Sequence, residues 1–228
     1  MKPNFEGDAN RTFFTSANFL SCRFRFQKVA IVGEIPFAHY GVDNGSSDSG
    51  DNALGNPYVG VELWSREDVF FELGGRLPVA PDDDEEGGAA AMVGLFTDFV
   101  DRLEAFASDA VPIVAAFNYL YKGQSGLGFR LRGGTSFQIA TGEREETEWF
   151  VLYGTQIGYW GPVVNFSGGL SGRLWVTEDA GSFGEQTWHQ VVLALGFAPG
   201  VVQPSVNIRF PLDEDLSDIL DWVVGINL

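Results

Sequence analysis

Hydrophobic and polar residues alternate with a period of two along most of this chain, and the two resulting faces differ sharply in composition. We expect the first two segments, 22–26 and 29–40, to pair as a hairpin in which Phe26 lies opposite Val29. Side chains alternate across a strand, so this register gathers large hydrophobic residues on one face and arginine, glutamate and small residues on the other. A small-residue face that also carries charges is typical of barrels with a polar interior and an apolar exterior.

The alternation recurs in eleven segments, at 22–26, 29–40, 58–64, 69–79, 111–121, 127–140, 149–159, 162–177, 187–197, 201–212 and 219–228. Single-chain bacterial barrels have an even number of strands, so residues 10–17 are expected to add a twelfth, with ten strands as the alternative. The prediction is an all-β protein. It is an antiparallel up-and-down transmembrane β-barrel of about 12 strands that forms a single domain over residues 1–228, with a flexible tail at 1–10.

One segment, residues 89–109, departs from this period. Its hydrophobic residues recur every three or four positions and its charged residues lie opposite, which predicts an amphipathic helix. The apolar face consists of Met92, Phe96, Phe99, Leu103 and Phe106, and the polar face of Asp98, Asp101, Arg102 and Glu104. Because the helix lies between strands, we expect it outside the barrel wall, as a loop helix, a lid or a plug that reaches into the lumen. A packed loop helix is favoured over a gate.

Tight turns alternate along the chain with long loops that are mostly acidic, as in barrels of the outer membrane. Eight aromatic residues fall near predicted strand ends, where interfacial girdles require them. They are Trp64, Tyr121, Trp149, Tyr159, Trp160, Trp175, Trp188 and Trp222. This arrangement favours membrane lipids as a partner.

The formal net charge of −17 argues against nucleic-acid binding, which needs concentrated lysine and arginine. No run of 18 apolar residues occurs, so no transmembrane helix is expected. Cys22 is the only cysteine and is expected to face lipid, so we predict no intramolecular disulfide, no metal site and no cofactor. Residues 1–11 lack a signal segment, so a location in the outer membrane requires a signal peptide that is removed and is not present in this chain.

Ten charged residues take the inward face of the predicted strands and are the candidate lumen-lining residues. They are Arg23, Arg25, Glu34, Glu62, Glu72, Arg76, Arg130, Arg132, Arg173 and Arg209. Charges inside a barrel must be paired or hydrated. Two interpretations stay open: an arginine–glutamate lattice that rigidifies a narrow or blocked lumen, and an arginine-lined path for anionic or polar solutes.

Catalytic chemistry has little support in the sequence. His39 and His189 are far apart in the chain and both take the outward face, and no Gly-x-Ser-x-Gly nucleophile elbow occurs. The acidic residues that could act as acid and base also serve as partners for the arginines. We therefore expect no catalytic residues and no enzyme activity.

Two segments and the final strand carry a resemblance to a known family. The segments are Glu72-Leu73-Gly74-Gly75-Arg76-Leu77-Pro78 and Val202-Gln203-Pro204-Ser205-Val206-Asn207-Ile208-Arg209-Phe210-Pro211-Leu212, followed by residues 222–228. With the strand layout, they resemble Gram-negative outer-membrane β-barrel proteins, and among these a family of proposed channels tied to the meta-pathway of phenol degradation. The chain departs from the usual barrel ending in having Leu228 where a terminal aromatic residue is typical. The resemblance implies passive passage of small, hydrophobic molecules and names no catalytic residues.

The leading expectation is an outer-membrane barrel that acts as a channel or passive transporter for small-molecule solutes. One alternative is a plugged barrel with a structural or adhesive role. Another is a soluble β-barrel or sandwich that binds a hydrophobic ligand inside. The solute and the oligomeric state are left undetermined by the sequence.

Overall fold

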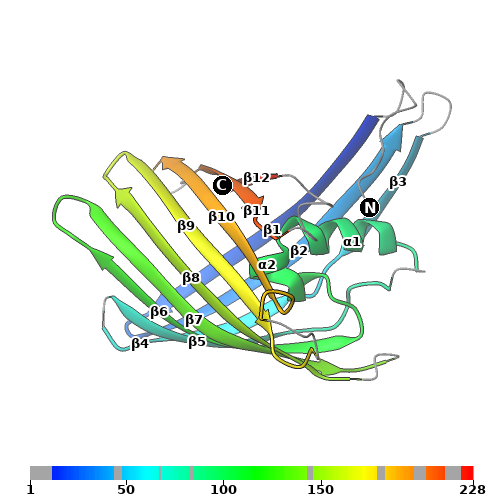
Figure 1. Ribbon diagram of the computed structural model, residues 1–228, viewed down its shortest axis with the longest axis horizontal. Helices are drawn as coiled ribbons and strands as arrows, with labels where there is room; N and C mark the ends of the chain where they lie inside the picture. Colours follow the sequence, from blue (N-terminus) through cyan, green and yellow to red (C-terminus); the bar gives the residue numbers. More distant parts are fainter. Residues whose placement is uncertain are drawn as a thin grey trace.

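The computed structural model describes residues 12–43, 48–66, 68–82, 85–142, 146–178, 183–197, 204–213 and 222–227. Its main element is one sheet of twelve strands (Figure 1). The strands are β1 (Thr12–Phe26), β2 (Val29–Asp43), β3 (Asp48–Leu54), β4 (Tyr58–Trp64), β5 (Val69–Arg76), β6 (Ala110–Lys122), β7 (Leu127–Ala140), β8 (Glu148–Trp160), β9 (Val164–Trp175), β10 (Thr187–Phe197), β11 (Ser205–Pro211) and β12 (Val223–Asn227). Between β5 and β6 lie α1 (Gly88–Thr97), α2 (Phe99–Arg102) and the 3-10 turn η1 (Leu103–Ala105).

The strand order follows the chain. All ladders are antiparallel and run β1-β2-β4-β5-β6-β7-β8-β9-β10-β11-β12, with β3 paired to β2. The all-β, antiparallel architecture predicted from the alternation is therefore confirmed. The sheet is strongly curved (Figure 1) but open, because within the described residues no ladder joins β1 to β12. The predicted closed barrel is thus observed as a curled sheet with two edges.

The strand count agrees with the prediction for a partly different reason. Residues 10–17 form no separate strand, because their described part continues directly into β1. The twelfth strand is β3, which lies between the predicted strands at 29–40 and 58–64, where no strand is predicted. Its polar, glycine-containing sequence has low strand propensity, and it forms because the long β2 offers it an edge to pair with. The flexible tail predicted at 1–10 lies outside the described residues.

The strands β3 and β4 together form one interrupted partner for β2. β3 pairs with the half of β2 from Phe37 to Asp43, and β4 pairs with the half from Val29 to Glu34. The interruption falls at residues 55–57, where the Gly55 N–H still donates to the Pro36 carbonyl at 2.9 Å. This break makes room for the end of the helical segment.

The two faces of the sheet have the polarity that the alternation predicts. The first hairpin has the expected register, with Phe26 opposite Val29. Large hydrophobic side chains are exposed on the outer face, including Phe24 at 60%, Leu73 at 60% and Ile157 at 69%. Polar side chains are buried on the inner face, including Glu62, Asn118, Gln138 and Arg173. Apolar side chains therefore form the outer surface, and polar ones form much of the interior.

The helical residues 88–105, which we call the interior segment, cross the concave side of the sheet (Figure 1). α1 packs against β1, β2 and β3, and α2 packs against β9 and β10. The segment thus connects the first strands of the sheet to late ones across the interior. No helix in the described part of the chain is both long and apolar enough to cross a bilayer.

The single amphipathic helix predicted over 89–109 is wrong in two respects. The backbone breaks at Asp98, with φ −140° and ψ 48°, so two short helices and a 3-10 turn replace one helix. The buried face of α1 consists of small residues, whereas Met92, predicted on the apolar face, is 45% exposed. Alanines on both partners form this core, with Ala90 and Ala91 packing near Ala38 of β2, so small side chains let helix and sheet approach closely.

Candidate functional site

A cavity of about 480 Å³ lies in the interior, between the inner face of the sheet and the interior segment. Its charged lining comprises six arginines and six acidic residues. These are Arg23, Arg76, Arg102, Arg130, Arg132 and Arg209 with Glu34, Glu62, Glu72, Asp98, Asp101 and Glu104. The formal charges of this lining balance, so the cavity is polar without a net preference for either sign.

Eight of the ten predicted lumen-lining residues line this cavity: Arg23, Glu34, Glu62, Glu72, Arg76, Arg130, Arg132 and Arg209. The other two do not. Arg25 is exposed, and its guanidinium carbon lies 4.2 Å from the centre of the Trp64 ring. Arg173 is fully buried and binds the interior segment. The eight residues share one face of the sheet because side chains alternate along a strand. Contact of these residues with solutes stays a prediction.

Two ion pairs join neighbouring parts of the cavity wall. Arg23 on β1 lies 2.8 Å from Glu62 on β4, which is 2% exposed. Arg132 on β7 lies 3.7 Å from Glu72 on β5, whose carboxylate also accepts a hydrogen bond of 2.6 Å from the Tyr58 hydroxyl. Each acid is therefore held by a partner from another strand, which links strands beyond their backbone ladders.

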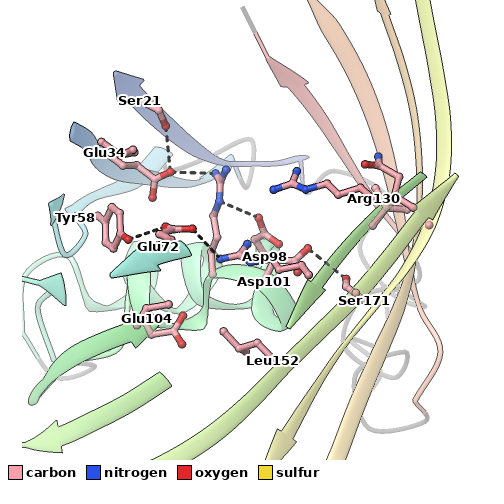
Figure 2. A pocket seen from close by; sticks show the side chains of 18 of the residues that line it. Ser21, Glu34, Tyr58, Glu72, Asp98, Asp101, Glu104, Arg130, Leu152 and Ser171 are labelled. Atoms are coloured by element: carbon pink, nitrogen blue, oxygen red, sulfur yellow. Dashed lines mark hydrogen bonds and ion pairs between the residues drawn. The ribbon is translucent and has the colours of Figure 1, made fainter. Parts of the chain in front are cut away.

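Glu34 is the centre of a larger network (Figure 2). Its carboxylate accepts hydrogen bonds from the Ser21 hydroxyl at 3.1 Å and from Arg76 at 2.7 Å. Arg102 of the interior segment lies 3.6 Å away from the same carboxylate. A buried charge is tolerated where partners and hydrogen bonds replace water. This network binds the interior segment to the β2 side of the wall.

Asp98, at the break between the helices, pairs with a late strand of the sheet rather than with β2. Its Oδ2 lies 3.2 Å from Arg209 on β11 and 3.6 Å from Arg102, yet neither oxygen accepts a well-aligned hydrogen bond. The side chain is 2% exposed, and its burial raises the pKa of Asp98 above its ordinary value, although the charge of Arg209 opposes this shift. Asp98 is thus an ion-paired but poorly solvated carboxylate in the cavity wall.

The strongest contact between segment and sheet is the pair of Glu104 and Arg173. The two side chains meet in two parallel hydrogen bonds of 2.8 and 3.0 Å, and Arg173 Nε donates to the Val100 carbonyl at 3.0 Å. Burial by itself would raise the pKa of Glu104, but the charge and hydrogen bonds of Arg173 lower it to about 2. This bidentate pair, which we call the clamp, fixes η1 to β9.

Asn56, at the break between β3 and β4, is a positioning residue that was not predicted from the sequence. Its side-chain amide donates to the carbonyls of Glu104 and Ala107 at 3.0 and 2.6 Å. Its side-chain oxygen accepts from the N–H groups of Val79 and Ala80, both at 2.8 Å. All four bonds depend on tertiary contacts, so only its place between glycine and proline, which marks a chain break, signals it in the sequence.

The ring of Phe106 packs between the interior segment and the sheet. It packs edge-on against Phe19 of β1, with ring centres 6.2 Å apart. A methyl group at Gly94 of α1 would stand 2.6 Å from the ring, and one at Gly55 would stand 2.8 Å from it. Glycine is therefore required at both positions by close approach.

A second polar cluster lies on the other face of the sheet. The Tyr153 hydroxyl lies 2.6 Å from His189 Nε2, and His189 Nδ1 lies 3.3 Å from Asp213. The neighbouring Gln190 points inward to the interior segment, so His189 points outward, as the register predicted. The Tyr153 ring occupies the space above Gly172, which indicates a packing role for this cluster.

Among the described residues, no group of three or more His, Cys, Asp or Glu side chains is arranged to hold a metal ion. Comparison with known proteins found no matching family model, no matching curated protein and no matching solved structure.

Proposed function

We propose that this chain is an outer-membrane β-barrel protein that provides a restricted passage for small polar solutes. The observation that carries the proposal is the inverted polarity of the sheet, with apolar side chains outside and a charged cavity inside. A protein in water would leave this outer face in contact with solvent at a large cost in free energy. In a bilayer the same face is solvated by lipid.

The aromatic residues at strand ends support this placement. Trp64, Tyr121 and Trp160 end or nearly end strands at the rim of short turns, whereas Trp149 and Trp175 stand at the opposite rim. On β8, ten residue steps separate Trp149 from Tyr159. At about 3.3 Å per step and a typical tilt of about 40°, these steps span roughly 25 Å, the height of the apolar band of membrane barrels.

Membrane insertion requires that the two edges of the sheet meet. An unpaired strand edge in hydrocarbon leaves backbone N–H and C=O groups without partners, which costs several kcal/mol for each group. The proposal therefore includes pairing of β1 with β12. Its support is the interior segment, which contacts β1 to β3 through α1 and β9 and β10 through α2 and so joins the first strands of the sheet to late ones around one interior.

The charged lining favours polar solutes over the hydrophobic ones that the family resemblance implies. Six arginines and six acidic residues line the cavity, so a solute inside it meets charged groups from both the sheet and the interior segment. The interior segment lies across this cavity, joined to it by the clamp and by the Glu34 network. We infer that the segment sets how freely solutes pass.

The experiment replaces residues 88–105 with a short glycine–serine linker. β5 and β6 are neighbours, with Gly75 opposite Ile113, so a short loop can join them without deforming the sheet. The refolded protein should migrate differently in unheated and boiled gel samples, and single-channel conductance in planar bilayers should rise well above that of the intact chain. The matched control replaces the β7–β8 connection, residues 141–147, with the same linker and should leave conductance unchanged.

A plugged barrel with a structural role is the second candidate, and the buried clamp favours it because a bidentate pair resists opening. It predicts no solute uptake by the intact chain and conductance only after replacement. If the intact chain and the linker variant both fold but show neither conductance nor uptake, the proposal that the chain provides a passage is wrong. If the chain purifies without detergent as a monodisperse monomer, the membrane location is overturned as well.

A further inference from the structure

Two charged side chains in the cavity wall have no ion-pair partner among the described residues. Ten of the twelve charged lining residues lie within ion-pair distance of an oppositely charged group. The exceptions within the described part of the chain are Asp101 on α2 and Arg130 on β7. One is an anion and the other a cation, and both line the same cavity.

Asp101 is held in place by neutral donors. Its Oδ2 accepts hydrogen bonds from Gln190 Nε2 at 2.8 Å and from the Ser171 hydroxyl at 3.3 Å. Gln190 is buried and also donates to Ser171 at 3.0 Å, so the three side chains form a fixed group. These donors orient the carboxylate without neutralising it, and Oδ1 receives no hydrogen bond from the described residues.

Arg130 of β7 is likewise oriented by a neutral partner. Its Nη2 donates to Asn118 Oδ1 at 2.9 Å, and Asn118 is fully buried. Its remaining guanidinium nitrogens have no acceptor in the described residues, and the side chain points into the cavity (Figure 2). A guanidinium with free N–H groups is well suited to bind a carboxylate.

We propose that this cavity binds small zwitterions, with the ammonium group at Asp101 and the carboxylate at Arg130. This inference rests on the proposed function and names its solute class. A lone anion would satisfy Arg130 but leave Asp101 unpaired, and a lone cation would do the reverse. A zwitterion pairs both groups and adds no net charge to a balanced lining.

The volume of the cavity suits a molecule of amino-acid size. About 480 Å³ lies within the roughly 300–1,000 Å³ of small-molecule sites. The preferred separation of the two charges can be measured with ligands of different chain length. The probes are the ω-amino acids from glycine to 6-aminohexanoate, with the matching carboxylic acids, amines and neutral hydroxy-amides as single-charge and uncharged controls.

Binding is measured by calorimetry on the full chain in detergent, and permeation by swelling of proteoliposomes. We expect one or two chain lengths of the ω-amino acid series to bind at least about tenfold more tightly than their single-charge controls, because a hydrogen bond to a charged group contributes about 1.5–3 kcal/mol. Asp101→Asn and Arg130→Gln should each remove this preference, and Arg130→Lys should retain part of it. Arg66→Gln and Glu85→Gln, in exposed loops, should leave it unchanged.

Folding of each variant is checked by its heat-modifiable migration, so loss of preference in a misfolded variant is not counted. Equal affinity for zwitterions and uncharged controls in the intact chain overturns the inference, and so does a preference that survives both Asp101→Asn and Arg130→Gln. Ion conductance with no zwitterion preference overturns only the inference. Zwitterion binding without conductance or swelling supports the inference and overturns the passage.

Discussion

At the residue scale, burial of charge is the main feature of the interior. Glu104 and Arg173 are 3% and 0% exposed, and their stability depends on each other. Removing one partner of a buried ion pair leaves an uncompensated charge, which costs about 3–5 kcal/mol, whereas replacing both with apolar residues is often neutral. At the clamp, a single substitution should therefore destabilise the fold, whereas the double substitution should change its stability little.

We predict that Arg173→Met lowers the free energy of unfolding by about 3–5 kcal/mol and that Arg173→Met with Glu104→Leu recovers most of this loss. The measurement is urea unfolding in lipid vesicles followed by tryptophan fluorescence. The Arg66→Gln variant, exposed at a turn, serves as the control and should unfold like the intact chain. Equal destabilisation by the single and double substitutions would contradict the clamp.

The same pair predicts a response to acid. The pKa of Glu104 falls from an ordinary 4.5 to about 2 in the folded chain, so its contribution to stability is complete above pH 4.5 and is lost as pH falls toward 2. We expect conductance to rise across this window as the interior segment is released. The variant that combines Arg173→Met with Glu104→Leu should lose this rise in conductance at low pH. If its conductance still rises in the same pH range, other carboxylates cause the response.

At the scale of the element, the interior segment is held by close packing as much as by charge. Phe106 packs against Gly94 of the segment and Gly55 of the β3–β4 break. Alanines on α1 and β2 keep helix and sheet close together. The segment has few long apolar side chains on its buried face, so its position depends on this fit.

We predict that Gly94→Ala destabilises the packing of α1 against Phe106, even though alanine is a better helix former than glycine by about 1 kcal/mol. The added methyl would overlap the Phe106 ring, and overpacking of this kind costs about 1–3 kcal/mol. Hydrogen exchange followed by mass spectrometry should show faster exchange of α1 amides. Met92→Ala, at an exposed position of the same helix, is the matched control. Slower exchange in Gly94→Ala would show that the gain in helix propensity outweighs the overlap with Phe106.

At the scale of the whole molecule, the proposed membrane location depends on the two edges of the sheet, which must pair with each other. Cys22 is the only cysteine of the chain, and it lies on β1, the first edge strand. β12 is the other edge strand. Cys22 is exposed on the outer face, so an oxidative cross-link can report on its neighbours.

If the barrel closes, single cysteines introduced at positions 222–227 will include at least one that forms a disulfide with Cys22. Paired strands bring Cα atoms to about 4.5–5.5 Å, within reach of a disulfide. The measurement is gel migration after mild oxidation of the protein in vesicles, with reduction as a reversal. Leu131→Cys, on the outer face of β7, should not cross-link within one chain. A folded, heat-modifiable protein without any β1–β12 cross-link would contradict closure.

Much of the sheet could be predicted because its information is local. The alternation of Phe24 and Phe26 with Arg23 and Arg25 determines which face each side chain takes, whatever the strand pairs with. A turn of two residues then determines the register of the hairpin, as Phe26 opposite Val29 shows. The strands, the polarity of the faces and the grouping of arginines with acids on one face all follow from this short-range geometry.

The sequence by itself therefore determined an antiparallel, all-β protein with an apolar outside and charged inside. Only the tertiary structure decided that β3 forms, that residues 88–105 cross the interior, and that Asp98 and Glu104 are buried rather than exposed. These features depend on partners far away in the chain, such as Arg173, 69 residues from Glu104. A helical period shows which residues share a face, but not whether that face meets water, an alanine-lined strand or a buried arginine.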